Sequence, residues 1–92
     1  MAIVMHQELP GVTQAQADEL VGQLLGKLKS TPGFIAHASG PTANGYFVTE
    51  FWESQEAHDQ WLRTQVMPVM QQAGAHLTVQ PRITTAANIV TR

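Results

Sequence analysis

The sequence predicts an α+β fold, in which two helices cover one face of a four-stranded antiparallel sheet. Three observations lead to this prediction. Strand-like and helix-like segments follow one another in the order β-α-β-β-α-β, and the first helical segment carries an apolar stripe on one side only. The length of 92 residues suits one domain, spanning residues 1–92.

The first strand and the first helix are predicted from the N-terminal third of the chain. Residues 2–9 begin with an apolar run and end at Pro10-Gly11, which predicts a strand closed by a turn. Thr13 and Gln16 have the spacing of a capping box, so we expect a helix to begin there. The apolar face of this helix comprises Ala17, Leu20, Val21, Leu24, Leu25 and Leu28.

A hairpin is predicted next. Pro32 and Gly33 end the helix, because the residue before a proline avoids helical geometry and glycine permits a turn. Residues 34–39 and 46–52 have the composition of strands, and the loop between them, residues 40–45, is rich in turn-forming residues. We expect the two strands to pair as an antiparallel hairpin.

The second helix and the last strand complete the order. Ser54 is expected to cap the helix, whose entrance is acidic. Pro68 lacks an N–H and collides with the carbonyl of Thr64, which predicts a kink or break there. Gly74 marks the expected end of the helix, and residues 77–90 are strand-like.

With right-handed crossovers this order is the ferredoxin-like arrangement, which leaves one sheet face open. Charged residues make up 13% of the chain, against about 25% in an ordinary domain. None lies between Ser30 and Thr49, and only Arg82 and Arg92 lie between Thr64 and the end. Solvent-facing strands usually carry charge, so we predict a homodimer in which a second copy covers the open face.

The composition also argues against several classes of protein. A net charge of −2 and a pI near 6.0 argue against a nucleic-acid or anionic-membrane surface. The absence of cysteine excludes disulfides, a thiolate nucleophile and a cysteine metal site. No apolar run is long enough to span a membrane and no secretory signal is visible, so we expect a cytoplasmic protein.

Three segments resemble one known family. They are Pro32-Gly33-Phe34, Gly45-Tyr46-Phe47-Val48, and Trp52-Glu53-Ser54-Gln55-Glu56-Ala57-His58 followed by Trp61. Together they resemble the antibiotic biosynthesis monooxygenase-like family of the dimeric α+β barrel superfamily, over nearly the whole chain. The resemblance implies a dimeric barrel. It also implies a function among the cofactor-independent monooxygenases of aromatic polyketides, the polyketide cyclases and the haem-degrading oxygenases.

The haem-degrading branch of that family uses an asparagine in the first strand, a tryptophan in the second helix and a haem-ligating histidine near the end of that helix. Trp61 matches the tryptophan. The first-strand position falls at or beside Met5, and the ligand position falls within residues 70–72, where there is no histidine. The resemblance therefore argues against haem degradation, and we expect no cofactor.

The candidate catalytic pair is His37 and Glu50. Alternation along the hairpin places both on one sheet face, and pairing Ser39 with Tyr46 would make Glu50 the diagonal neighbour of His37. A carboxylate beside an imidazole orients the ring for service as a general base. The alternative is a buried polar pair, or a hydrogen bond in a dimer interface.

Aromatic residues and a second histidine are the candidate ligand-binding residues. His58 and Trp61 lie three apart on the second helix and therefore side by side, and Tyr46 and Trp52 could add ring walls from the strand. The alternative for these rings is ordinary core packing. The four histidines, His6, His37, His58 and His76, lack metal-ligand spacing, so no metal is expected.

These observations predict a small-molecule enzyme that resembles cofactor-independent monooxygenases and acts on an aromatic or polyketide-like substrate, starting with proton removal by His37. One alternative is a polyketide-type cyclase or isomerase that uses the same pocket. The other is a non-catalytic dimer that binds a hydrophobic metabolite. Sequence alone leaves the substrate and the choice among these three open.

Overall fold

The computed structural model describes residues 1–75 and 78–92. His76, and Leu77 at the start of the predicted last strand, lie outside the described residues. The elements along the chain are β1 (Ile3–Pro10), α1 (Gln14–Leu28), β2 (Phe34–Thr42), β3 (Gly45–Trp52), α2 (Gln55–Trp61), the π-helical η1 (Leu62–Val66), α3 (Met67–Ala73) and β4 (Arg82–Thr85).

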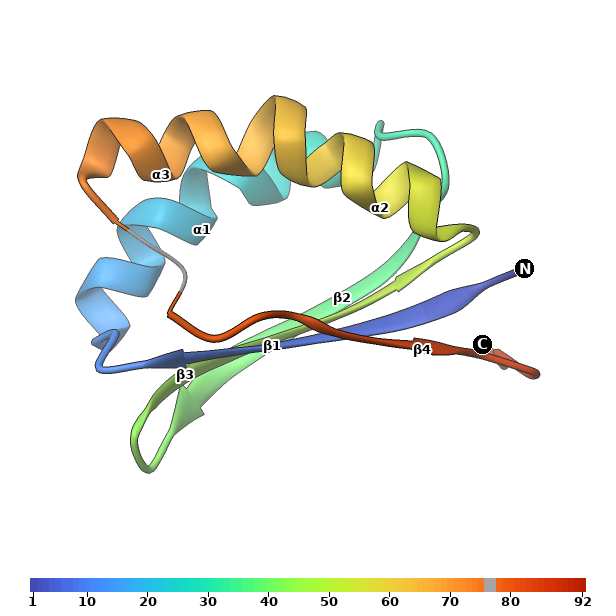
Figure 1. Ribbon diagram of the computed structural model, residues 1–92, viewed down its shortest axis with the longest axis horizontal. Helices are drawn as coiled ribbons and strands as arrows, with labels where there is room; N and C mark the ends of the chain where they lie inside the picture. Colours follow the sequence, from blue (N-terminus) through green and yellow to red (C-terminus); the bar gives the residue numbers. More distant parts are fainter. Residues whose placement is uncertain (76–77) are drawn as a thin grey trace.

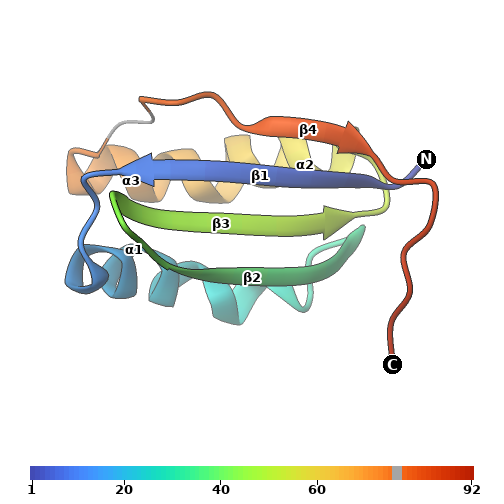
Figure 2. The same cartoon turned by 90° about the horizontal axis from the view of Figure 1, so that it is seen from below.

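The predicted ferredoxin-like α+β fold is confirmed. The four strands form one antiparallel sheet in the order β2-β3-β1-β4. All helices lie on the same face of that sheet, α1 beside the continuous rod of α2, η1 and α3 (Figure 1). Viewed from below, the sheet lies in front of the helices, and no helix of the described residues covers this outer face (Figure 2). The cavity described below lies between the sheet and this helical layer.

The tip of the hairpin differs from the prediction. Residues 40–42 continue β2 instead of opening a loop, and Thr42 pairs with Gly45 across a two-residue turn. Each predicted cross-strand partner therefore moves by two residues, so that Ser39 faces Val48 rather than Tyr46. Because side chains alternate with a period of two, a shift of two residues leaves each one on the predicted face.

The kink or break predicted in the second helix at Pro68 takes the form of a π-helical turn. The helix does not break at Thr64; instead it widens to one turn of π-helix, in which the Met67 N–H donates to the Leu62 carbonyl five residues earlier. Pro68 then stands in the first turn of α3, where its missing N–H is tolerated. A π-turn thus accommodates the proline without ending the rod.

The last strand is shorter than the predicted span of residues 77–90. Only Arg82–Thr85 pairs with β1, and residues 86–92 extend past the end of the sheet without regular structure (Figure 2). The strand begins directly after Pro81, which cannot donate to a ladder hydrogen bond. The other predicted signals are confirmed: Thr13 and Gln16 form the capping box, Ser54 caps α2, and Gly74 ends α3 in a left-handed conformation.

The core lies at the end of the sheet where β1 begins. Trp52 is fully buried, with Ile3, Met5, Leu28 and Trp61 around it. The Phe34 ring meets the Trp52 ring edge-on at a centroid distance of 5.6 Å, because a β-bulge between Phe34 and Ala36 places Phe34 opposite Trp52. This cluster anchors α1 and α2 to the sheet beside the cavity described below.

The turn between α1 and β2 depends on Gly33. Its φ is 84°, and a Cβ placed there would lie 2.6 Å from the Cβ of Ala57 at the start of α2. We expect Gly33→Ala to lower the free energy of unfolding by about 1–3 kcal/mol, because it adds backbone strain and a steric clash. Urea denaturation measures this change.

Gly22 provides the matched control for that substitution. It lies within α1, and a Cβ there would meet nothing within 4 Å. Gly22→Ala should therefore raise the free energy of unfolding by about 0.5–1 kcal/mol, since alanine favours the helix. Equal effects of the two substitutions would contradict the role assigned to the Gly33 turn.

The outer face of the sheet carries half-buried aromatic and aliphatic side chains. They include Val4, Phe47 and Phe51, and the Phe47 ring stacks on the His6 imidazole at a centroid distance of 6.1 Å. A second copy over this face stays a prediction, since the structure contains one chain. Within the described residues, no helix has the length and hydropathy needed to cross a membrane.

Candidate functional site

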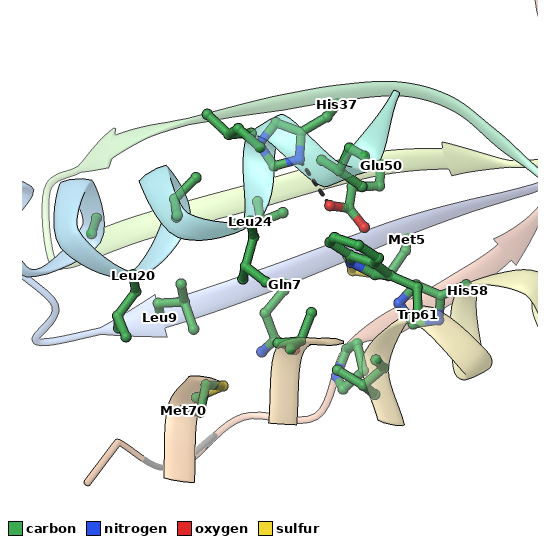
Figure 3. Close-up of a pocket in the computed structure, with 18 of the residues that line it drawn as sticks. Met5, Gln7, Leu9, Leu20, Leu24, His37, Glu50, His58, Trp61 and Met70 are labelled. Carbon is green, nitrogen blue, oxygen red and sulfur yellow. Dashed lines mark hydrogen bonds and ion pairs between the residues drawn. The ribbon is translucent and has the colours of Figure 1, made fainter. Parts of the chain in front are cut away.

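A cavity of about 140 Å³ lies between the sheet and the helices (Figure 3). Its walls come from β1, α1, β2, β3, α2, η1 and α3. Most of the described residues that line it are apolar: Met5, Leu9, Val12, Ala17, Leu20, Val21, Leu24, Leu25, Leu28, Val48, Trp61, Leu62, Val66, Met70, Ala75 and Pro81. The polar ones are Gln7, His37, Glu50 and His58. An apolar pocket with a few convergent polar groups is typical of a small-molecule site.

His37 and Glu50 form a hydrogen-bonded pair on the sheet wall of the cavity. The distance between His37 Nδ1 and Glu50 Oε2 is 2.8 Å, and Glu50 is 4% exposed. The indole N–H of Trp52 donates to Glu50 Oε1 over 3.1 Å, so both carboxylate oxygens have partners. This arrangement satisfies a buried charge and fixes the direction of the carboxylate.

The two residues meet because they stand directly opposite each other in the β2–β3 ladder. The prediction placed Glu50 diagonally from His37; the two-residue change in register makes the pair closer than predicted. Directly paired residues have Cβ atoms about 4.5–5.5 Å apart, which suits the direct hydrogen bond. Side-chain alternation then directs both groups toward the helices (Figure 3).

The other nitrogen of His37 also has a partner. Its Nε2 lies 3.0 Å from the Ser39 hydroxyl oxygen, two residues along the same strand face. Because a carboxylate can only accept, Nδ1 carries the hydrogen that Glu50 receives, and in the neutral imidazole Nε2 is then the acceptor for the Ser39 O–H. The basic nitrogen of His37 is thus held in a single orientation by a hydroxyl that a ligand hydroxyl could replace.

A second histidine reaches the cavity from the helical wall. His58 is 2% exposed, and its Nδ1 lies 3.2 Å from Oδ1 of Asp59, whose side chain is 41% exposed. By the same argument Nδ1 donates to the carboxylate and Nε2 is an acceptor. Among the described residues no side chain hydrogen-bonds to this Nε2. The cavity is therefore lined by two histidines that each have a carboxylate partner, His37 on the sheet and His58 on α2.

Gln7 is a cavity residue that the sequence analysis did not single out. It is 6% exposed, and its amide nitrogen donates to the backbone carbonyls of Glu8 over 2.9 Å and of Val79 over 2.6 Å. Alternation along β1 could have identified it, because Gln7 interrupts the apolar inner set of Ile3, Met5 and Leu9. A polar residue on a buried strand face is a candidate for ligand contact.

The structure places the six predicted site residues in two groups. His37, Glu50, His58 and Trp61 line the cavity together. Tyr46 and Trp52 are buried on the same sheet face but do not belong to its lining. Tyr46 lies opposite Leu9 and Pro41 near the hairpin turn, and Trp52 packs in the core behind Glu50.

The histidines do not gather into a metal cluster in the described part of the chain. There, no group of three histidine, aspartate or glutamate side chains has the proximity of metal ligands. His6 lies on the outer sheet face, bonded to Thr49 Oγ1 at 2.8 Å and Glu8 Oε1 at 2.9 Å, away from the cavity.

The sequence of the chain matches a known family. The family model described as antibiotic biosynthesis monooxygenase matches residues 3–73. The chain belongs to this family. The match covers β1 through α3, and so all four polar residues of the cavity. No curated protein matches the chain.

Solved structures share the fold of this monooxygenase-family chain. A variant of SnoaB, a cofactor-independent oxygenase from Streptomyces nogalater, is 16% identical with a TM-score of 0.70, over 99% of this chain and 97% of that one. A haem-degrading protein from Mycobacterium tuberculosis is 20% identical with a TM-score of 0.64, over 99% and 100%. A conserved protein from Methanosarcina mazei is 18% identical with a TM-score of 0.62, over 91% and 89%.

Proposed function

We propose that this family member oxygenates a phenolic aromatic substrate with molecular oxygen, beginning with proton removal by His37 and without a bound cofactor. The observation that carries the proposal is the His37–Glu50 pair on the wall of an apolar cavity. The relation to a cofactor-independent oxygenase supports the choice of reaction. The cavity volume of about 140 Å³ is below the usual range of about 300–1,000 Å³ for ligand pockets, which argues against haem as the ligand.

The first step is deprotonation of a phenol. The substrate hydroxyl takes the position of the Ser39 hydroxyl at His37 Nε2 and gives up its proton to that nitrogen. Glu50 stabilises the resulting imidazolium through Nδ1, which lies 2.8 Å away. The apolar walls keep water from the phenolate, so its electron density stays available for oxygen.

The second step is reaction with oxygen. The phenolate gives one electron to O₂, and the phenoxyl radical and superoxide combine at a ring carbon to form a C–O bond. The imidazolium of His37 protonates the terminal peroxide oxygen. His58 Nε2, an acceptor on the opposite wall, then removes the hydrogen from the same ring carbon as a proton.

The last step releases water. The electrons of the broken C–H bond form a carbonyl, the O–O bond breaks, and the departing hydroxide takes the proton from His58. Phenol plus O₂ thus gives quinone plus water, and both histidines return to their starting state. The protein supplies two positioned proton carriers and a dry cavity, and the substrate itself reduces the oxygen.

Oxygen uptake tests this proposal. We expect the purified protein with a metal chelator to consume one O₂ per quinone formed from each of several alkylphenols. Product formed equally fast without oxygen would instead show a cyclase or isomerase that uses the same base. Tight binding of these compounds with no product under either condition would show a binding protein.

We also propose that the protein acts as a homodimer through the outer face of its sheet. The half-buried rings of Phe47 and Phe51 on that face support the proposal, because a second copy would remove this apolar surface from water. The described residues that line the cavity come from one chain, so each subunit would carry its own site.

A further inference from the structure

The size of the cavity limits the substrate to one aromatic ring. Its volume is about 140 Å³, and an engineered cavity of about 150 Å³ in another protein binds benzene. A rigid fused system of three rings would have to displace the surrounding side chains, whereas a flexible chain on a single ring can continue out of the cavity into solvent. Trp61, at 3% exposure, forms the wall at the inner end, and the fully buried Trp52 packs against it at a centroid distance of 6.2 Å, so the cavity cannot extend there.

Polar and aliphatic groups occupy opposite ends of the cavity. His37, Glu50 and Met5 share one row of the sheet, and His58 and Trp61 of α2 lie at the same end of the cavity, whereas Leu9 lies two rows farther along (Figure 3). Leu9, Leu20 and Met70 surround that second end with aliphatic carbon (Figure 3). Leu25, which is 43% exposed, forms part of the wall facing solvent. A ring in the polar end would therefore direct a substituent along an aliphatic channel toward the exterior.

Gln7 stands between these two ends and presents an acceptor. It lies one row from Met5 on the inner face of β1, about 7 Å along the strand. Its amide nitrogen has two hydrogens, and the backbone carbonyls of Glu8 and Val79 accept them. Among the described residues no group donates to its oxygen Oε1, so this is the atom that a ligand in the cavity can reach with a donor. An oxygen acceptor selects a ligand group that donates, such as a second hydroxyl.

We propose that the substrate is a single-ring diphenol with an aliphatic chain, whose second hydroxyl donates to Gln7 Oε1. This inference rests on the proposed function for the reacting hydroxyl, which His37 binds. Gln7 is then the residue that determines specificity for the second hydroxyl. The chain occupies the aliphatic channel from Leu9 to the solvent-facing side.

Calorimetric titration with four compounds tests the proposal without any turnover. The probes are 5-pentylresorcinol or pentylhydroquinone as the diphenol, 3-pentylphenol without the second hydroxyl, resorcinol without the chain, and anthrone with three rings. Of the two pentyl diphenols, we expect the one with the higher affinity to bind about tenfold more tightly than pentylphenol, which lacks the second hydroxyl. It should also bind at least about tenfold more tightly than resorcinol, which lacks the chain, and more tightly than anthrone. Pentylphenol affinity equal to that of both diphenols, or tighter binding of anthrone, would overturn the proposal.

Gln7→Leu removes the acceptor while keeping the size of the side chain. We expect the preference for the diphenol over pentylphenol to fall to less than about threefold, with the affinity for pentylphenol unchanged. Gln80→Leu, an exchange at an exposed position, should keep the full preference. If Gln7 had a purely structural role, the substitution would lower the affinity for both compounds equally, and that result would overturn the assignment. If Gln7→Leu does not fold, the affinities of the unmodified protein for the four compounds still test the proposed ligand class.

The outcomes separate this inference from the proposed function. Tight binding of the diphenol with no oxygen uptake would contradict the oxygenase and leave the ligand class standing. Rapid oxygen uptake with anthrone, together with weak binding of every pentyl diphenol, would contradict the ligand class and leave the oxygenase standing.

Discussion

His37→Ala is expected to lower the rate of oxygen uptake by at least about 100-fold, the usual effect of losing a general base or acid. His37 is the group that removes the phenol proton and later protonates the peroxide, so both steps slow together. The measurement is the initial rate in an oxygen electrode at saturating substrate. Binding of the substrate, measured by calorimetry, should weaken far less than the rate, since the apolar walls remain.

His6→Ala is the matched control for this variant. His6, like His37, stands on a strand and has one carboxylate and one hydroxyl as hydrogen-bond partners, but it lies on the outer sheet face. Its removal should leave the rate within about twofold of the unmodified protein, because His6 does not line the cavity and each subunit of the proposed dimer carries its own site. Equal losses in both variants, or an unchanged rate in His37→Ala, would contradict the assignment of the base.

Trp52→Ala is expected to lower the free energy of unfolding by about 3–5 kcal/mol, as large aromatic truncations in cores do. Trp52 is 0% exposed, and its ring contacts the rings of Phe34, His58 and Trp61 at centroid distances of 5.6, 5.9 and 6.2 Å. The loss is a large share of the about 5–15 kcal/mol that stabilises a domain. Urea denaturation followed by circular dichroism measures it.

Trp52→Phe separates packing from the hydrogen bond. It keeps an aromatic ring but removes the N–H that donates to Glu50 Oε1 over 3.1 Å. A buried carboxylate oxygen without its donor costs about 1–3 kcal/mol, and the freed carboxylate would hold His37 less firmly, so the oxygen-uptake rate should also fall. For the preceding variant, Trp52→Ala, a decrease of less than about 1 kcal/mol in the free energy of unfolding would show that this ring does not anchor the core.

The alternation of apolar and polar side chains along the strands predicted most of the sheet and the shared face of the candidate catalytic residues. It placed His37 and Glu50 on the same face before any register was known, and that placement held although the predicted pairing was wrong by two residues. The capping residues Thr13 and Ser54 also predicted the starts of their helices correctly, because each cap depends on residues only three positions apart. Local patterns of this kind do not require knowledge of the tertiary structure.

The features that were mispredicted, left open or missed depend on contacts between distant segments or on a choice between alternative local structures. Residues 40–42 have turn-forming character, yet they pair with β3 because the ladder supplies their hydrogen bonds. Pro68 could be accommodated by a break or by a π-turn, and composition does not distinguish the two. The Gln7 orientation is fixed by the carbonyl of Val79, which is 72 residues away in the chain.

The most direct test of the central claim is the origin of the oxygen atom in the product. The reaction is run under oxygen-18 gas in ordinary water, and the quinone is analysed by mass spectrometry at short times. The proposed reaction predicts one labelled oxygen per quinone from the unmodified protein, with product formation lost in His37→Ala. Product without label, or with label acquired only from oxygen-18 water, would contradict oxygenation in this cavity.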